Sequence, residues 1–296
     1  MERNKEYDAF GPWLYEIDEE HEIPRLFKGC CSQEGYLMLF KVPRHIERRK
    51  ASPGMDLYDY LVGARETCLH IFRREGKKAV ERKVDYNEIL AVKNFHALLK
   101  GELVLYTRGG PVSIEYNTVS EEIIQKLINI IETRISGKAR SVGIEGIPAE
   151  YDADGADFVD MLFESLLGKL RAWNSCARLA AFQPEINIKW TRNMKAKLQQ
   201  KACAPAKLAF VTTGSELIVI SQELSKRNRR KETLDYACLY LPYQNIKRAR
   251  AVSFDEEQAI SIMELDAGGK TFLFVFENGN IGVLKLCSVL DSMGAA

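Results

Sequence analysis

Side chains that could carry out chemistry are sparse in this sequence. It contains no G-x-S-x-G nucleophile elbow, no Walker loop, no G-x-G-x-x-G after a strand and no H-E-x-x-H pair. The four histidines are His21, His45, His70 and His96. All lie in the first third of the chain, which excludes a histidine-dependent active site in the second half. His70 alternates with apolar neighbours in a predicted strand, so we interpret it as a solvent-facing residue and not as a general base. The sequence predicts no catalytic residue and a protein that is not an enzyme.

The seven cysteines are scattered along the chain, which is typical of reduced thiols. The candidate metal ligands are His21, Cys30, Cys31 and Cys68. Two adjacent cysteines fit a tetrahedral shell poorly, and C-x-x-C pairs are missing, so ordinary thiols are the favoured interpretation. The acidic run from Glu145 to Glu164 lacks the spacing of a calcium loop and is interpreted as a solvated linker. We expect no metal and no cofactor.

Two basic clusters are the candidate sites for an anion or a partner. The first comprises Arg227, Arg229, Arg230 and Lys231 on a predicted loop, and the second comprises Arg44, Arg48 and Arg49. Each basic residue next to an anionic membrane contributes about 1 kcal/mol, so either cluster could give weak, reversible binding. The alternative is that both clusters are solvated or pair with the acidic linker.

Composition narrows the class of protein further. The 42 Lys and Arg residues against 41 Asp and Glu give a net charge of +1, which argues against a nucleic-acid binder. A hydrophobic content of 46% with balanced charge excludes a disordered chain. No apolar stretch reaches the roughly 18 residues that span a bilayer, and the charged N-terminus does not look like a signal peptide. We therefore expect a cytoplasmic protein.

Alternating apolar residues predict two series of strands, each followed by an amphipathic helix. The first-series strands are Tyr60–Ala64, Cys68–Arg73, Val80–Val84, Ile89–Phe95, Leu98–Thr107 and Val112–Tyr116. Thr118 and Glu121 form a capping-box pattern at the start of the first helix, and Gly137 ends it. The second-series strands are Leu208–Thr212, Glu216–Ser221, Thr233–Leu241, Ile246–Phe254, Ala259–Leu265 and Thr271–Glu277. Helical spacing over Val283–Met293 follows them, and another helix is predicted from Asp157.

The two series indicate an internal repeat. The segment Tyr86–Ile89 aligns with Tyr243–Ile246, 157 positions later. The pair Gly109-Gly110 aligns with Gly268-Gly269, 159 positions later. Near-constant offsets are what a divergent duplication leaves, although chance similarity of short strands remains the alternative.

Antiparallel strands, a Tyr-x-x-Ile step, a Gly-Gly hairpin and a closing helix resemble the bacterial pleckstrin-homology-like (PH-like) domains, here in tandem. The resemblance implies an α+β fold of two bent antiparallel sheets or partial barrels, each closed by a C-terminal helix and joined by a helical linker. The implied segments are an N-terminal extension at 1–55, domains at 56–137 and 206–296, and a linker at 138–205.

The PH-like family shares no catalytic residues, and its members are known as scaffolds for protein, peptide or lipid contacts. The resemblance therefore implies a non-catalytic binding or scaffold protein that recognises a protein or peptide, including by strand pairing at a sheet edge. The alternatives are peripheral binding to anionic lipid through the basic loops and, third, an enzyme without a recognisable motif. The sequence specifies neither the partner nor the oligomeric state.

Overall fold

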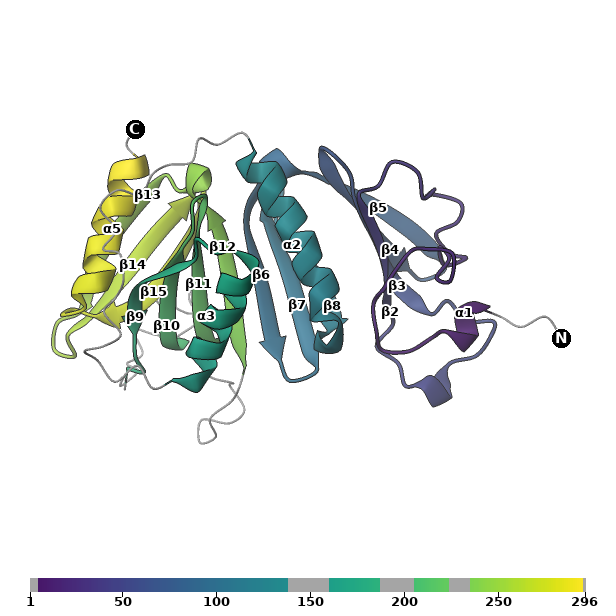
Figure 1. The fold of residues 1–296 in the computed structure, drawn as a ribbon, viewed down its shortest axis with the longest axis horizontal. Helices are drawn as coiled ribbons and strands as arrows, with labels where there is room; N and C mark the ends of the chain where they lie inside the picture. The colour runs from purple at the N-terminus through teal and green to yellow at the C-terminus, as the bar shows by residue number, and fades with distance from the viewer. Residues whose placement is uncertain (1–4, 138–159, 187–204, 224–234, 295–296) are drawn as a thin grey trace. The chain divides into compact units, whose positions relative to one another are not determined.

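The computed structural model describes residues 5–137, 160–186, 205–223 and 235–294. They form an α+β fold in which most strands pair in antiparallel sheets (Figure 1). The described strands form no closed barrel. The chain divides into two compact units: unit 1 is Met1–Ile89 with Leu98–Lys138, and unit 2 is Leu90–Ala97 with Ala139–Ala296. None of the helices within the described ranges is long and apolar enough to cross a membrane.

Unit 1 contains a five-stranded sheet, a hairpin and a long helix. The sheet has the order β1 (Tyr15–Glu16), β2 (Met38–Pro43), β3 (Tyr58–Ala64), β4 (Cys68–Glu75) and β5 (Lys78–Asp85). The other elements are α1 (Lys5–Asp8), the 3-10 turns η1 (Arg48–Lys50), η2 (Tyr86–Glu88) and η3 (Thr118–Ser120), the hairpin β7 (Lys100–Thr107) and β8 (Val112–Asn117), and α2 (Glu121–Ser136). Residues predicted as an N-terminal extension thus supply two strands of this sheet.

The core of unit 1 combines that N-terminal segment with the sheet. Phe10 and Phe27 pack with Leu61 and Phe72 in one buried cluster, and Phe10 meets Tyr58 edge to face. Burial of such side chains is the main stabilising contribution, about 1.5 to 3 kcal/mol for each large one. The segment before β2 is therefore part of the folded unit.

Helix α2 carries the predicted apolar stripe, and Ile124, Leu127 and Ile131 are fully buried while Ile123 is half-buried. The predicted capping box is wrong. Residues Thr118–Ser120 form the 3-10 turn η3, and the side chain of Asn117 accepts a hydrogen bond from the amide of Val119. The Thr118 hydroxyl donates instead to the carbonyl of Leu98. The capping pattern failed because the amide of Glu121 donates to the backbone carbonyl of Thr118 in this turn, and not to its hydroxyl.

Unit 2 contains two antiparallel sheets. The first has the order β6 (Ile89–Ala97), β12 (Tyr236–Pro242), β11 (Glu216–Glu223), β10 (Pro205–Thr212) and β9 (Arg178–Gln183). The second has the order β13 (Arg248–Asp255), β14 (Ile260–Ala267) and β15 (Lys270–Glu277). The other elements are α3 (Met161–Trp173), the 3-10 turn η4 (Tyr243–Asn245) and α5 (Ile281–Gly294), which packs against β13 and β9 (Figure 1).

Part of the predicted linker belongs to the fold of unit 2. Strand β9, which the sequence did not predict, pairs with β10. The rings of Phe163 on α3 and Phe182 on β9 meet edge to face, 5.5 Å between centroids. The segment Lys189–Lys201, predicted as a helix or a linker, lies outside the described residues.

The same short turn interrupts both strand series. Turn η2 lies between β5 and β6, and η4 lies between β12 and β13. The Tyr86 hydroxyl donates to the carbonyl of Arg65 (2.9 Å), and its amide donates to the carbonyl of Thr67 (3.2 Å). The Tyr243 hydroxyl and amide donate in the same way to carbonyls of Thr213 (3.3 Å) and Ser215 (3.0 Å). Strands β5 and β12 thus precede matching turns, and β6 and β13 follow them.

Candidate binding site

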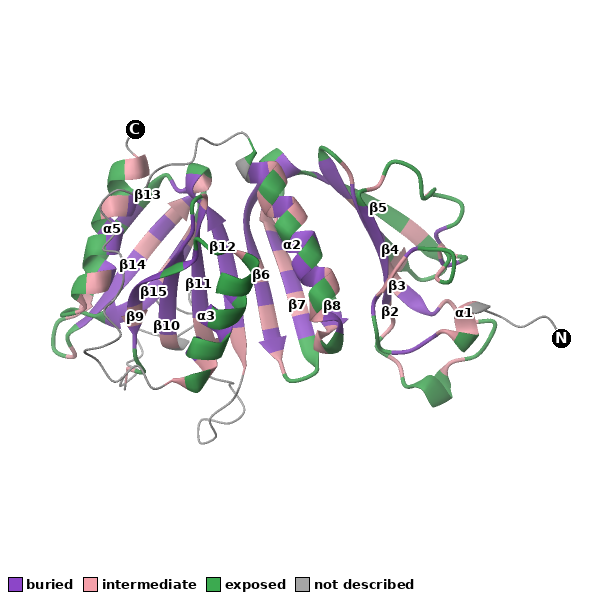
Figure 2. Ribbon diagram, viewed as in Figure 1, coloured by how far each residue is buried: buried purple, intermediate pink, exposed green. Residues whose placement is uncertain are grey.

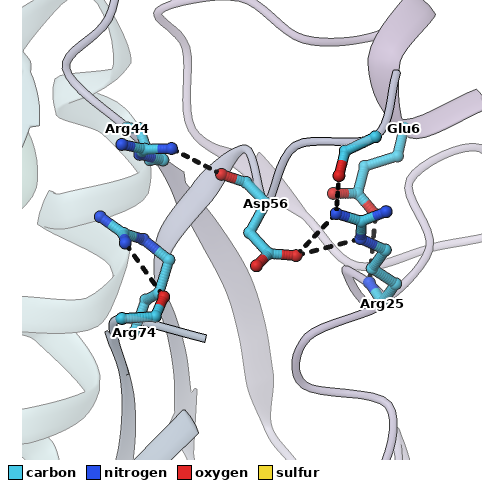
Figure 3. A network of polar contacts seen from close by, with 7 residues as sticks. Glu6, Arg25, Arg44, Asp56 and Arg74 are labelled. Atoms are coloured by element: carbon cyan, nitrogen blue, oxygen red, sulfur yellow. Dashed lines mark hydrogen bonds and ion pairs between the residues drawn. The ribbon is translucent and has the colours of Figure 1, made fainter. Parts of the chain in front are cut away.

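The first basic cluster that the sequence singled out, Arg227, Arg229, Arg230 and Lys231, lies outside the described residues. Of the second cluster, Arg44 belongs to a network of polar contacts (Figure 3). Its guanidinium donates to the backbone carbonyl of Asp56 (3.1 Å) and lies 3.9 Å from the carboxylate of Asp59. Asp59 also binds Arg74 at 2.7 Å. Arg44, directly after β2, thus contacts Asp56 and Asp59 around the start of β3.

The same network holds the N-terminal segment. Asp56 accepts two hydrogen bonds from the guanidinium of Arg25, at 2.9 and 3.0 Å, while Glu6 accepts from the backbone amide of Arg25 (Figure 3). Charge-assisted bonds of this kind are shorter and stronger than neutral ones. The network therefore joins α1, the loop before β2 and the start of β3.

Arg48 and Arg49 also have partners within unit 1. The Arg48 guanidinium lies 4.2 Å from the ring centroid of Tyr7 and donates to the carbonyl of the same residue. Arg49 pairs with Glu47, and its side chain is 79% exposed. Both arginines are exposed, and the charge of Arg49 is balanced by its neighbour Glu47. An anion-binding role for this cluster remains a prediction without a specific contact to support it.

The histidine and cysteine side chains that could take part in chemistry lie in contacts within unit 1. The prediction that His70 faces solvent is wrong. Its Nδ1 lies 2.6 Å from a carboxylate oxygen of Glu81, and its side chain is only 18% exposed. Burial raises the pKa of the Cys30 and Cys31 thiols, which disfavours the reactive thiolates. Groups of three or more His, Cys, Asp or Glu side chains that could hold a metal are absent from the part of the chain that the structure describes.

One buried pair in unit 1 is unusual. Lys41 is 2% exposed, donates to the carbonyl of Glu22 (3.1 Å) and lies 5.0 Å from the ring centroid of Tyr58. Burial lowers the pKa of this lysine. The buried Tyr58 hydroxyl has no hydrogen-bond partner in the described residues, and burial raises its pKa. Both residues contact the N-terminal segment, Lys41 at the carbonyl of Glu22 and Tyr58 at the ring of Phe10.

Strand pairing supplies a clearer candidate for binding. In unit 2 one edge of β6 is paired with β12, with Phe95 opposite Ala237 and Lys93 opposite Leu239. The rings of His96 and Tyr236 stack at 4.6 Å, 8° from parallel. Almost all residues of β12 are buried, and β6 is buried over its first four residues and then alternates half-buried with buried ones (Figure 2). The strand that follows the tyrosine turn η2 therefore accepts a strand on its edge.

Strand β13 follows the matching turn η4 and pairs with β14 on one side. Among the described strands, none pairs with its other side. The amide of Ala249 donates to the carboxylate of Asp291 on α5 (3.1 Å), so it points away from β14. Backbone groups alternate along an antiparallel strand, so those of Ala251 and Ser253 also point outward.

We call this surface the β13 edge: the backbone of Ala251 and Ser253 with the side chains of Arg250 and Val252. All four residues are exposed. Val252 is one of the exposed large hydrophobic residues of the chain, at 38%. The sequence analysis missed this site. The only signal in the sequence is a valine close to two arginines in a predicted strand.

Strand β5 is the counterpart of β12 and, among the strands that the structure describes, also lies at the end of its sheet. Most of its residues are exposed, among them Val80 at 45%, and it carries five charged side chains (Figure 2). Charged side chains on an edge discourage unwanted strand pairing. The paired strands β6 and β12 are mainly apolar, whereas β5 and β13 are charged.

A scan of the chain against protein-family models finds no matching family, and no curated protein matches its sequence. The function is therefore inferred from the residues and geometry of this chain.

Proposed function

We propose that this protein is a non-catalytic cytoplasmic binding protein, built from two PH-like domains, that captures an extended segment of another protein on the β13 edge. One observation carries the proposal. The edge that follows the first tyrosine turn is paired with a strand, whereas none of the described strands pairs with the edge that follows the second. An added strand gains affinity from main-chain hydrogen bonds and specificity from alternate side chains.

Three observations support the equivalence of the two edges. Turns η2 and η4 occur at the same place in the element order. Tyr86 and Tyr243 make matching hydrogen bonds. The glycines Gly110 and Gly269 both have a φ of 101°, a conformation that glycine adopts readily. A shared PH-like architecture accounts for all three.

The test is a selection of displayed eight-residue peptides on the full-length protein, with hydrogen exchange as the readout. Selected peptides are expected to protect the amides of Ala251 and Ser253. The Ala251→Pro variant is expected to lose binding, because proline removes an outward-facing donor while the bonds to β14 remain.

Two controls separate pairing at the edge from damage to the fold. Ala209→Ser lies in a central strand and leaves the β13 edge intact, so it should retain peptide binding if the protein folds. A peptide with methylated backbone nitrogens on the side facing β13 should not bind the natural protein. Selection of no peptide, or binding that survives both changes at the edge, would contradict the proposal.

A further inference from the structure

The paired strands β6 and β12 provide a register for the β13 edge. A shift of 157 positions, from Tyr86 to Tyr243, places Phe95 at Val252 and Lys93 at Arg250. In the observed pair, Ala237 lies opposite Phe95, and Leu239 lies opposite Lys93. A strand added to β13 in this antiparallel register presents one residue opposite Val252 and the residue two positions later opposite Arg250.

The β13 edge offers two different contacts on one face. Side chains two positions apart in a strand point to the same side, so Val252 and Arg250 form a neighbouring apolar and basic pair. The Nε of Arg250 donates to Glu264 on β14, and its side chain is 51% exposed. A guanidinium has five N–H donors, so a second carboxylate can bind the same group.

Strand addition is limited at both ends of β13. Asp291 occupies the outward amide of Ala249, so strand addition is confined to the part of β13 that follows this residue. The register of β13 with β14 is interrupted between Ser253 and Asp255. The usable stretch is therefore short, and its specificity depends mainly on Arg250 and Val252.

We propose that the occupant of the β13 edge is an extended segment of another protein with an apolar residue opposite Val252 and an Asp or Glu, two positions later, opposite Arg250. This inference rests on the proposed function and defines the chemistry of its partner. Directly opposed side chains of opposite charge stabilise a strand pair, and like charges destabilise it.

The chain's own β5 meets half of this requirement. The same shift of 157 positions places Val80 where Ala237 lies and Arg82 where Leu239 lies. A second copy would thus place a valine opposite Val252 and an arginine opposite Arg250. The like charge disfavours a second copy as the occupant, and a single change in β5 converts its sequence into the proposed partner.

The experiment compares two fluorescent peptides on the full-length protein by anisotropy. One copies β5, Lys78–Asp85, and the other carries the change Arg82→Glu. We expect the glutamate peptide to bind about fivefold more tightly at low salt, with the difference shrinking as salt rises. On the Arg250→Glu variant the preference should reverse, and on Arg250→Gln it should disappear.

Equal affinities on the natural protein, no reversal, or no binding of either peptide would overturn this inference. The outcome also separates it from the proposed function. Two peptides that bind equally well, and that both lose binding on Ala251→Pro, would leave edge capture intact while rejecting the acidic requirement. Binding that Ala251→Pro does not alter would reject both. The Arg250→Gln variant protects the test against a folding defect in Arg250→Glu, whose new carboxylate would lie beside that of Glu264.

Discussion

Tyr86 and Tyr243, 157 positions apart, hold corresponding loops through the same two hydrogen bonds. Each ring is buried, and its hydroxyl reaches a carbonyl of the loop between two strands of its sheet. Burial raises the pKa of both phenols, so both hydroxyls keep their protons as donors at neutral pH. These bonds fix the position of the turn from which the next strand, β6 or β13, begins.

The first prediction concerns the strength of these bonds. Tyr86→Phe should lower the free energy of unfolding by about 1.5 kcal/mol, because the half-buried carbonyl of Arg65 loses its short hydrogen bond. Tyr243→Phe should cost less, about 0.5 kcal/mol, because its hydrogen bond is longer, 3.3 Å against 2.9 Å. Urea unfolding followed by circular dichroism measures both changes. An unchanged midpoint in the Tyr86 variant would contradict this account.

The second prediction is the opposite result at a third buried tyrosine. The Tyr58 hydroxyl has no partner in the described residues, so Tyr58→Phe removes a polar group that burial penalises. We expect unfolding free energy to stay constant or to rise by up to about 1 kcal/mol. The same urea experiment measures it, with Tyr86→Phe as the comparison. A loss of about 1 kcal/mol or more would show that this hydroxyl has a stabilising partner.

The third prediction is a dependence of stability on pH that originates at Lys41. Burial lowers the pKa of this lysine from its ordinary value of 10.5, so the folded protein releases its proton at a lower pH than the unfolded chain does. Between those two pKa values the unfolded chain binds more protons, and stability therefore rises with pH. The Lys41→Met variant lacks this contribution.

The measurement is the unfolding free energy of both proteins at about pH 7.5 and about pH 9.5, below the ordinary lysine pKa. Lys41→Met should be at least as stable as the natural protein at the lower pH, and its relative advantage should shrink at the higher pH. Tyrosines with raised pKa act in both proteins and cancel in the comparison. An advantage that grows with pH would have the wrong sign for a lysine with a lowered pKa.

The fourth prediction separates two arginines by their burial. Arg74 binds Asp59 at 2.7 Å, with side chains 22% and 32% exposed, and Arg74→Met should lower stability by about 1 to 2 kcal/mol. Arg49→Met should change it by less than about 0.5 kcal/mol, because that ion pair is exposed. Thermal unfolding of the two variants side by side provides the test, and equal effects would contradict it.

The main elements could be predicted because their signals are local. Alternation of apolar residues indicated strands such as β4 and β11, and helical spacing indicated α2 and α5. Strand β9 was missed because it is a short apolar run within a segment whose acidic and basic flanks indicated a linker. The capping box at Thr118 failed because residues Thr118–Ser120 form a 3-10 turn, in which the amide of Glu121 donates to the backbone carbonyl of Thr118. The Thr118 hydroxyl donates to the carbonyl of Leu98, 20 residues distant in sequence.

The sequence by itself determined the α+β composition, the two Tyr-x-x-Ile steps and the apolar faces that strands and helices bury. Periodicity reports which face of a strand is buried, but it does not report which strand lies at its edge. Only the tertiary structure decided that β12 pairs with β6 and that β13 lies last in its sheet among the described strands. Edge pairing depends on backbone groups that every residue shares, so the choice of neighbour follows from packing between distant segments and not from local pattern.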